Sequence, residues 1–149
     1  MKPILPLMLV LALAASGAVH AADLRLHALL DGASVVSSTD STGTGEARAV
    51  LQDDGKLRIT LMFGGLAANV TGVELHTGAS SDNGPQVAVI DAKPGAQGWV
   101  GNTVLTLTPD VAANVRAGDA YLLVTTADFP AGALRGQLVP QPVRLPRTP

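Results

Sequence analysis

Apolar and polar positions alternate with a period of two along most of this chain. In the segment 56–63, Leu57, Ile59, Leu61 and Phe63 fall on one side, and the residues between them fall on the other. Such alternation is typical of a half-buried antiparallel strand, because successive side chains point to opposite faces of a sheet. The sequence therefore predicts an all-β protein. The predicted strands cover residues 24–30, 45–51, 56–63, 70–77, 86–90, 99–107, 120–126 and 133–139.

Turn-forming residues separate the predicted strands. Asp54-Gly55 lies between the second and third strands, and this dipeptide readily adopts the positive φ angles of a tight hairpin. Short strands separated by such turns indicate an antiparallel β-sandwich. One short helix is expected to begin at Pro109, which suits a first helical turn, and to end at Gly118.

The first 21 residues have the pattern of a removable secretory leader. Lys2 gives a positive start, residues 4–15 form an almost unbroken apolar run, and Ala21 ends a stretch of small residues suited to cleavage. The run is shorter than the about 20 residues that span a bilayer, so we expect cleavage after Ala21 and no membrane span. We therefore expect an exported protein, periplasmic or extracellular, and the compact leader together with cysteine-free export favours a bacterial source.

Cleavage would leave one domain, residues 22–139, followed by a Pro-rich tail, residues 140–149. The tail has little apolar periodicity, so we expect it to be extended and mobile. The chain has no cysteine, and the stability of the domain must therefore come from apolar packing and backbone hydrogen bonds.

The charge balance argues against a nucleic-acid partner. The chain carries 12 Asp and Glu against 10 Lys and Arg, and loss of Lys2 would leave nine basic residues and a net charge of −3. No cluster of basic residues interrupts this mild acidity, whereas binding to a phosphate backbone needs a basic surface. Aromatic residues make up 3% of the chain, too few for a groove that stacks bases or sugars, and Trp99 is expected in the core or at its edge.

Two stretches carry a more specific signal, Val73–Gly78 and Phe129–Leu138. Together with the spaced glycines of Thr42–Gly45, their order and spacing resemble the signatures of the CHRD domain, a module first recognised in chordin. The resemblance extends over about residues 26–138. It implies an immunoglobulin-like or superoxide-dismutase-like β-sandwich in exported proteins, and it implies no established catalytic activity.

The chain departs from that family pattern at three polar positions. Family members often show His-x-His where this chain has Glu74-Leu75-His76, His-Thr where it has Thr125-Thr126, and Gly-Glu where it has Gly132-Ala133. Any polar cluster that the family builds at these positions is therefore at most a remnant here.

A metal site is the first chemical hypothesis, with Glu74 and His76 as candidate ligands. They are two residues apart on a predicted strand, so both side chains project from the same face. A zinc site needs three or four protein ligands, and His27 and His76 would be the remaining imidazoles after cleavage. A copper site of the superoxide-dismutase type is out of reach, an ordinary solvated face is favoured over two-ligand binding, and we expect no cofactor.

Nucleophilic catalysis is not indicated either. The chain has no Gly-x-Ser-x-Gly motif, and Ser34, Ser37, Ser38 and Ser41 lie in a polar stretch that reads as a connector. We therefore expect no enzymatic activity.

Arg135 is the candidate for a contact, either structural or with a partner. Leu134 and Gly136 occupy the opposite face of its strand, so we expect Arg135 to be outward or half-exposed. A structural contact with a loop carbonyl, or with Glu74, is favoured over a partner contact. Tyr121 stands at a strand start and resembles the tyrosine corner of β-sandwiches, in which a hydroxyl bonds to the backbone.

These observations lead to an expected function and an alternative. We expect an exported, non-enzymatic binding or structural module that acts through a sheet face, an end loop or the Pro-rich tail, with an unidentified protein as its partner. The alternative is a weak metal-binding or redox protein of the dismutase-like type that uses Glu74 and His76.

Overall fold

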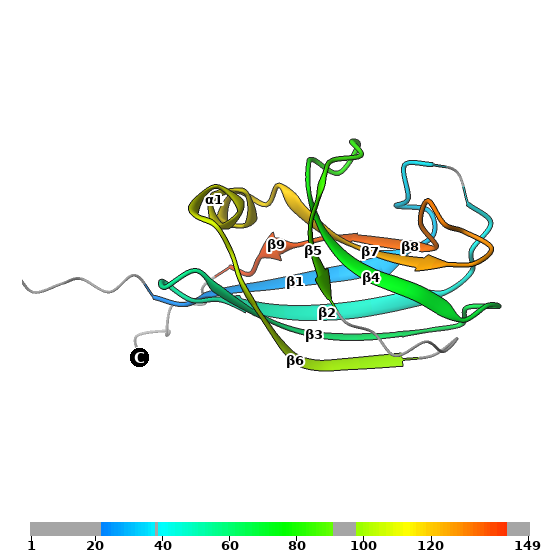
Figure 1. Cartoon of the computed structure of the whole chain (residues 1–149), viewed down its shortest axis with the longest axis horizontal. Coiled ribbons are helices and arrows are strands. Elements are labelled where there is room, and N and C mark those ends of the chain that lie inside the picture. The colour runs from blue at the N-terminus through cyan, green and yellow to red at the C-terminus, as the bar shows by residue number, and fades with distance from the viewer. Residues whose placement is uncertain (1–21, 38, 91–97, 143–149) are drawn as a thin grey trace, which may run out of the picture.

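The computed structural model describes residues 22–37, 39–90 and 98–142. The predicted leader, Ser38 and residues 143–149 of the predicted tail lie outside the described residues. Figure 1 shows the arrangement of the strands and the helix. The elements of the described chain are β1 (Leu24–Asp31), β2 (Thr44–Leu51), β3 (Lys56–Gly64), β4 (Val70–Thr77), β5 (Gln86–Ile90), β6 (Gly98–Thr106), α1 (Pro109–Ala117), β7 (Ala120–Thr126), β8 (Leu134–Gln137) and β9 (Val139–Pro140).

All strands belong to one antiparallel sheet, which confirms the predicted all-β fold. The strand order is β5-β4-β7-β8-β1-β2-β3-β6, and β9 pairs with β1. The sheet folds over on itself and nearly closes, so that β4 and β7 form one layer and β1, β2, β3 and β6 form the other (Figure 1). The join between the layers is the pairing of β1 with β8, where Asp31 stands opposite Arg135.

The core lies between the two layers, where the alternating apolar side chains meet. Leu57, Ile59 and Leu61 of β3 are fully buried, as the period-two pattern predicts, and Val73 and Leu75 of β4 are fully buried in the facing layer. Burial of a side chain of this size contributes about 1.5–3 kcal/mol of transfer free energy, which is the main stabilising term of a disulfide-free domain.

The predicted hairpin joins β2 and β3. Leu51 stands opposite Leu57, and Gly55 has a φ of 82° in the turn. The backbone amide and the side chain of Lys56 both bond to the Asp54 carboxylate. These hydrogen bonds with Lys56 lower the pKa of Asp54 below its ordinary value.

The predicted helix is α1, which lies at one end of the sandwich (Figure 1). The Thr108 hydroxyl accepts a hydrogen bond from the amide of Val111 at its N-terminus. Gly118 follows its last turn with a φ of 81°, a left-handed conformation that glycine adopts without steric cost. Ala112 and Val115 are buried against the strands, so α1 closes that end of the core.

The last predicted strand, 133–139, is divided in the structure. Its first part, β8, pairs with β7, and β9 leaves β7 to pair with β1, so that Leu26 stands opposite Pro140. The amide of Gln141 also donates to the carbonyl of Arg25 at 2.8 Å. The predicted tail therefore begins with two residues, Pro140 and Gln141, that pair with β1. The twist that closes the sheet brings this segment alongside β1, and the missing amide of a proline removes just one bond at a sheet edge.

Strand β7 is buried on both faces, unlike β4. All seven of its residues are buried, although alternate side chains point away from the core. Loops cover the outward side. Val35, in the β1–β2 loop, is 6% exposed. A side chain at Gly132 would contact both Val35 and Leu123 of β7, so this loop packs close to the outward side of β7.

Trp99 lies outside the core, so the prediction of a core position is wrong. Its side chain is 68% exposed. It stands opposite Met62 on the outward side of β6, whereas the next residue, Val100, points inward and is 7% exposed. The reason is the register with β3, in which Val100 stands opposite the buried Leu61 and Trp99 stands opposite the exposed Met62.

Candidate functional site

Five polar or aromatic side chains gather on the outward side of β4, β7 and β8. Across these strands His76 stands opposite Tyr121, and Tyr121 stands opposite Gln137. In the adjoining row Glu74 and Arg135 flank Leu123 on its two sides. We call Glu74, His76, Tyr121, Arg135 and Gln137 the polar cluster.

Glu74 and His76, the predicted pair on one face, bond to each other. His76 Nε2 lies 2.9 Å from Glu74 Oε2, and its Nδ1 lies 3.0 Å from the carbonyl oxygen of Gly84. A carbonyl can only accept, so Nδ1 carries a proton, and the second hydrogen bond requires one further proton between Nε2 and Oε2. Both ring nitrogens of His76 are therefore engaged, and its side chain is 12% exposed.

Tyr121 lies at the centre of the polar cluster, because β7 lies between β4 and β8. Its ring is stacked on that of His76, with the centroids 5.1 Å apart and the planes inclined by 21°. On the β8 side the guanidinium carbon of Arg135 lies 3.7 Å from the Tyr121 ring centroid, a cation–π contact. The Tyr121 hydroxyl accepts a hydrogen bond from the amide of Gly84 at 3.0 Å.

Arg135 points away from the core, as predicted, but its side chain is buried and not half-exposed. The side chain does leave the core side of β8, but the β4–β5 loop covers it and its exposed fraction is 1%. Its Nη2 donates to the carbonyl of Ala79 at 2.6 Å, whereas Nη1 has no hydrogen-bond partner among the described residues. Burial lowers the pKa of the Arg135 guanidinium, against the opposing effect of Tyr121 and Asp82. An arginine nevertheless stays protonated at neutral pH.

Gln137 is the member of the cluster that the sequence analysis missed. Its Nε2 donates to the carbonyl oxygens of Gly78 and Gly118, both at 2.8 Å. It therefore ties the β4–β5 loop to the residue that ends α1. The available signal was its spacing of two residues from Arg135, which places both side chains on one face of β8.

The backbone of the β4–β5 loop, residues 78–85, receives most of these contacts. Gly84 allows the loop to return close to β4, since a Cβ atom there would lie 1.5 Å from the carbonyl oxygen of Thr77. Backbone bonds add to the side-chain contacts: Thr77 donates to Pro85 at 3.1 Å and Gly78 donates to Asp119 at 2.9 Å. The polar cluster thus holds the loop against the outer side of the sheet.

Comparison with protein-family models matches the CHRD domain over residues 26–138. The chain belongs to the CHRD domain family. Comparison with curated proteins and with solved structures finds no match. The matched segment of this CHRD domain runs from β1 to the residue before β9, so it includes the whole polar cluster.

Glu74 and Thr125, which belong to two of the three positions where a departure from the family pattern is expected, both lie close to Gly72 of β4. A Cβ atom at Gly72 would lie 3.1 Å from the Thr125 hydroxyl and 3.5 Å from Glu74 Oε1. The Thr125 hydroxyl also lies 3.1 Å from that of Thr71. The third position, Ala133, is fully buried. This part of the site therefore presents a carboxylate and hydroxyls beside the single imidazole of His76.

The capacity of this site for metal is restricted to the Glu74–His76 pair. Within residues 22–37, 39–90 and 98–142, no three His, Asp or Glu side chains lie close enough together to hold an ion. An ion between Glu74 and His76 would replace the proton between Nε2 and Oε2.

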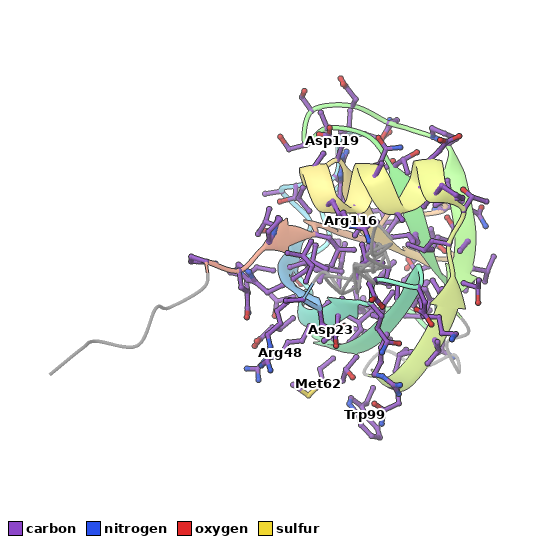
Figure 2. All side chains as sticks on the ribbon, turned by 90° about the vertical axis from the view of Figure 1, so that its left-hand side faces the viewer. Asp23, Arg48, Met62, Trp99, Arg116 and Asp119 are labelled. Carbon is purple, nitrogen blue, oxygen red and sulfur yellow. The ribbon has the colours of Figure 1, made fainter. Side chains whose placement is uncertain are left out.

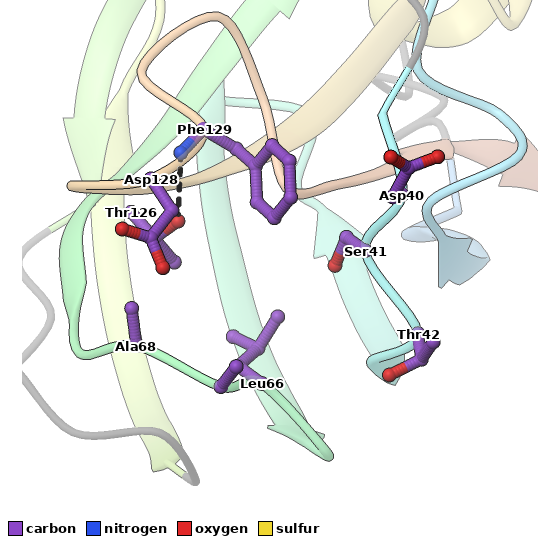
Figure 3. A pocket seen from close by; sticks show the side chains of 9 residues that line it. Asp40, Ser41, Thr42, Leu66, Ala68, Thr126, Asp128 and Phe129 are labelled. Atoms are coloured by element: carbon purple, nitrogen blue, oxygen red, sulfur yellow. Dashed lines mark hydrogen bonds between the residues drawn. The ribbon is translucent and has the colours of Figure 1, made fainter.

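A small cavity of about 170 Å³ lies apart from the polar cluster (Figure 3). Figure 3 shows Asp40 and Asp128 on different loops, with Leu66 between them below Phe129. The amide of Phe129 donates to the Thr126 hydroxyl at 3.1 Å. Ser41 lines the cavity, and its lining residues include no histidine. The lining residues are Asp40, Ser41, Thr42, Leu66, Ala67, Ala68, Thr126, Asp128 and Phe129.

Membrane insertion by a helix is not indicated by the described part of the chain, in which no helix has the length and hydrophobicity to cross a bilayer.

Proposed function

We propose that this CHRD-domain protein is exported and acts as a non-enzymatic binding or structural module of the periplasm or extracellular space. CHRD domains are generally found in secreted proteins, and residues 1–21 carry the leader pattern. Cleavage after Ala21 is part of the proposal. It predicts that the intact mass of the protein recovered from its native source corresponds to a chain that begins at Ala22.

The observation that carries the proposal is the engagement of His76. A general base needs a free ring nitrogen directed at a substrate proton. Here one ring nitrogen faces Glu74, the other faces the Gly84 carbonyl, and the ring is stacked on Tyr121. The residues that could do chemistry in the cluster are thus used to hold a loop, which supports a role in architecture and binding.

The competing function is weak metal binding or redox chemistry through Glu74 and His76. What favours it is their contact on one face of β4, at 2.9 Å. It requires an ion to compete with a short hydrogen bond and with the Gly84 carbonyl, and two protein ligands are fewer than a stable zinc site uses.

Elemental analysis of the native protein, with cross-linking in intact cells, separates the two functions. The proposed function predicts no metal at one equivalent per chain and a reproducible protein neighbour. One ion per chain, lost in His76→Ala, would overturn it in favour of the metal protein. Thr106→Ala, an exposed change on β6, is the matched control and is expected to leave both results unchanged.

A further inference from the structure

The outward side of β1, β2 and β3 collects positive charge. Four of the six Lys and Arg residues in the described chain point outward from these strands: Arg25, Arg48, Lys56 and Arg58. Glu46 bonds to Arg48 at 3.2 Å, and Asp54 bonds to Lys56. Arg25 and Arg58 form no ion pair within the described residues. This surface is therefore cationic on a domain whose overall charge is negative.

An apolar row crosses the same surface. Leu29 of β1 and Met62 of β3 flank Glu46 of β2, and Trp99 of β6 stands beside Met62. Leu29 is 67% exposed, Met62 55% and Trp99 68%. Figure 2 shows Arg48, Met62 and Trp99 projecting together on the side away from α1. Arginine, methionine and tryptophan are enriched in protein interfaces. We call this surface, Arg25, Arg48, Arg58, Leu29, Met62 and Trp99, the cationic face.

The cationic face carries shallow, open depressions along β2. Three depressions of about 540, 210 and 280 Å³ all include Glu46 among their lining residues, so they adjoin one another. They extend from Thr44 at one end of β2 to Val50 near the other. These seven residues of strand cover about 20 Å, which is the length of a short extended peptide.

We propose that the cationic face binds an extended acidic segment of another protein that carries apolar side chains. Its apolar side chains would lie against Leu29 and Met62 in the depression that Asp31 and Glu46 also line, and its carboxylates would meet Arg25 and Arg58. The proposal rests on the binding role proposed above and names the surface and the partner chemistry.

Charge and shape argue against three other occupants. A second copy docked on the same face would bring a second set of unpaired arginines to the interface, and like charges brought together across an interface cost free energy. The second occupant would be the segment 143–149 of this chain. That segment is basic, with Arg144 and Arg147, so its charge has the same sign as that of the cationic face. A membrane surface needs apolar side chains that reach into the lipid, whereas the Trp99 indole lies back over Gly101, where an added Cβ would be 2.7 Å from the ring.

Trp99 supplies the measurement, because it is the single tryptophan of the chain. The probe is a synthetic decapeptide that alternates Glu with Leu and Phe, titrated at low salt while Trp99 emission is recorded. We expect a shift of the emission to shorter wavelength, and an affinity at least about tenfold weaker for the same peptide with Gln in place of Glu.

The variants locate the binding. Arg25→Glu with Arg58→Glu is expected to weaken the Glu peptide by at least about tenfold. Arg116→Glu, the same type of substitution on α1 with half the charge change, is the control and is expected to leave the affinity unchanged. Equal binding of the Gln peptide, equal loss in the control, or no binding of the Glu peptide would overturn the proposal. Two further results would also overturn it: an emission shift with phosphatidylglycerol vesicles and not with the peptide, or a dimer that Met62→Glu abolishes.

Failure of this inference is distinguishable from failure of the proposed function. A photo-cross-linker placed at Met62 should capture the neighbour found in intact cells, and one placed at Ala113 on α1 should not. If a neighbour is captured from Ala113 and not from Met62, the cationic face is not the binding surface, and the proposed binding role still stands. Capture from neither position, together with no neighbour by general cross-linking, removes both.

Discussion

Arg135 brings a full charge into the covered side of the sheet, where its contacts are the Tyr121 ring at 3.7 Å and the carbonyl of Ala79. Removing a cation from water costs several kcal/mol even after the protein relaxes. A desolvated cation–π contact returns about 2 kcal/mol or more, and a hydrogen bond from a charged donor returns about 1.5–3 kcal/mol. The gains and the cost are therefore of similar size, and the planar shape of the guanidinium decides the balance.

This balance predicts that a buried charge without the planar contact to Tyr121 destabilises the protein more than loss of the charge does. Arg135→Lys retains a buried charge and loses the flat contact with Tyr121, so we expect it to lower the free energy of unfolding by about 2–4 kcal/mol. Arg135→Met removes the charge, fills a similar volume and should lower it by about 1–2 kcal/mol. Urea unfolding measures both values. A lysine variant as stable as the parent, beside a strongly destabilised methionine variant, would contradict the balance.

At the scale of elements, the sequence pattern predicted most of the fold. Alternation located the strands from β1 to β7 to within a few residues, and proline and glycine located α1. The pattern failed where contacts with neighbouring segments decide whether a side chain is buried. Trp99 and Val100 are both apolar, so alternation alone does not say which one points inward. Likewise, strand spacing placed Arg135 on the outer side of β8, but it carries no information about a loop that covers that side.

The candidate site was predictable to a similar degree. The two-residue spacing placed Glu74 and His76 on one face, and they do meet there. Their partners could not be read from spacing, because Tyr121, Arg135 and Gln137 come from strands whose order depends on the closure of the whole sheet. The Ala79 and Gly84 contacts depend further on the path of a loop.

The end of α1 offers a test of element boundaries. Gly118→Ala places a Cβ atom on a residue with a φ of 81°, and we expect it to lower the free energy of unfolding by about 1 kcal/mol. Ala113→Gly makes the opposite exchange at an exposed position inside α1 and should also destabilise by about 1 kcal/mol. Thermal unfolding measures both. If Gly118→Ala raised the stability, the helix would have to continue beyond residue 117.

At the scale of the whole molecule, the two outer sides of the sheet differ. The side formed by β4, β7 and β8 is covered by loops and carries the polar cluster. The side formed by β1, β2 and β3 is open and carries the cationic face. We propose that the polar cluster fixes a loop on one side of the sheet and that the opposite, open side receives a partner.

The amide hydrogen exchange of Gly84 tests that claim most directly. Its amide donates to the Tyr121 hydroxyl, whereas the amide of Gly78, in the same loop, donates to the backbone carbonyl of Asp119. In Tyr121→Phe the stacking ring remains and the acceptor is lost. We predict that the Gly84 amide then exchanges about tenfold faster, the equivalent of about 1.4 kcal/mol, while Gly78 changes much less. A Gly84 amide that already exchanges freely in the parent protein, or that the substitution leaves unchanged, would contradict the role of the polar cluster in holding the loop.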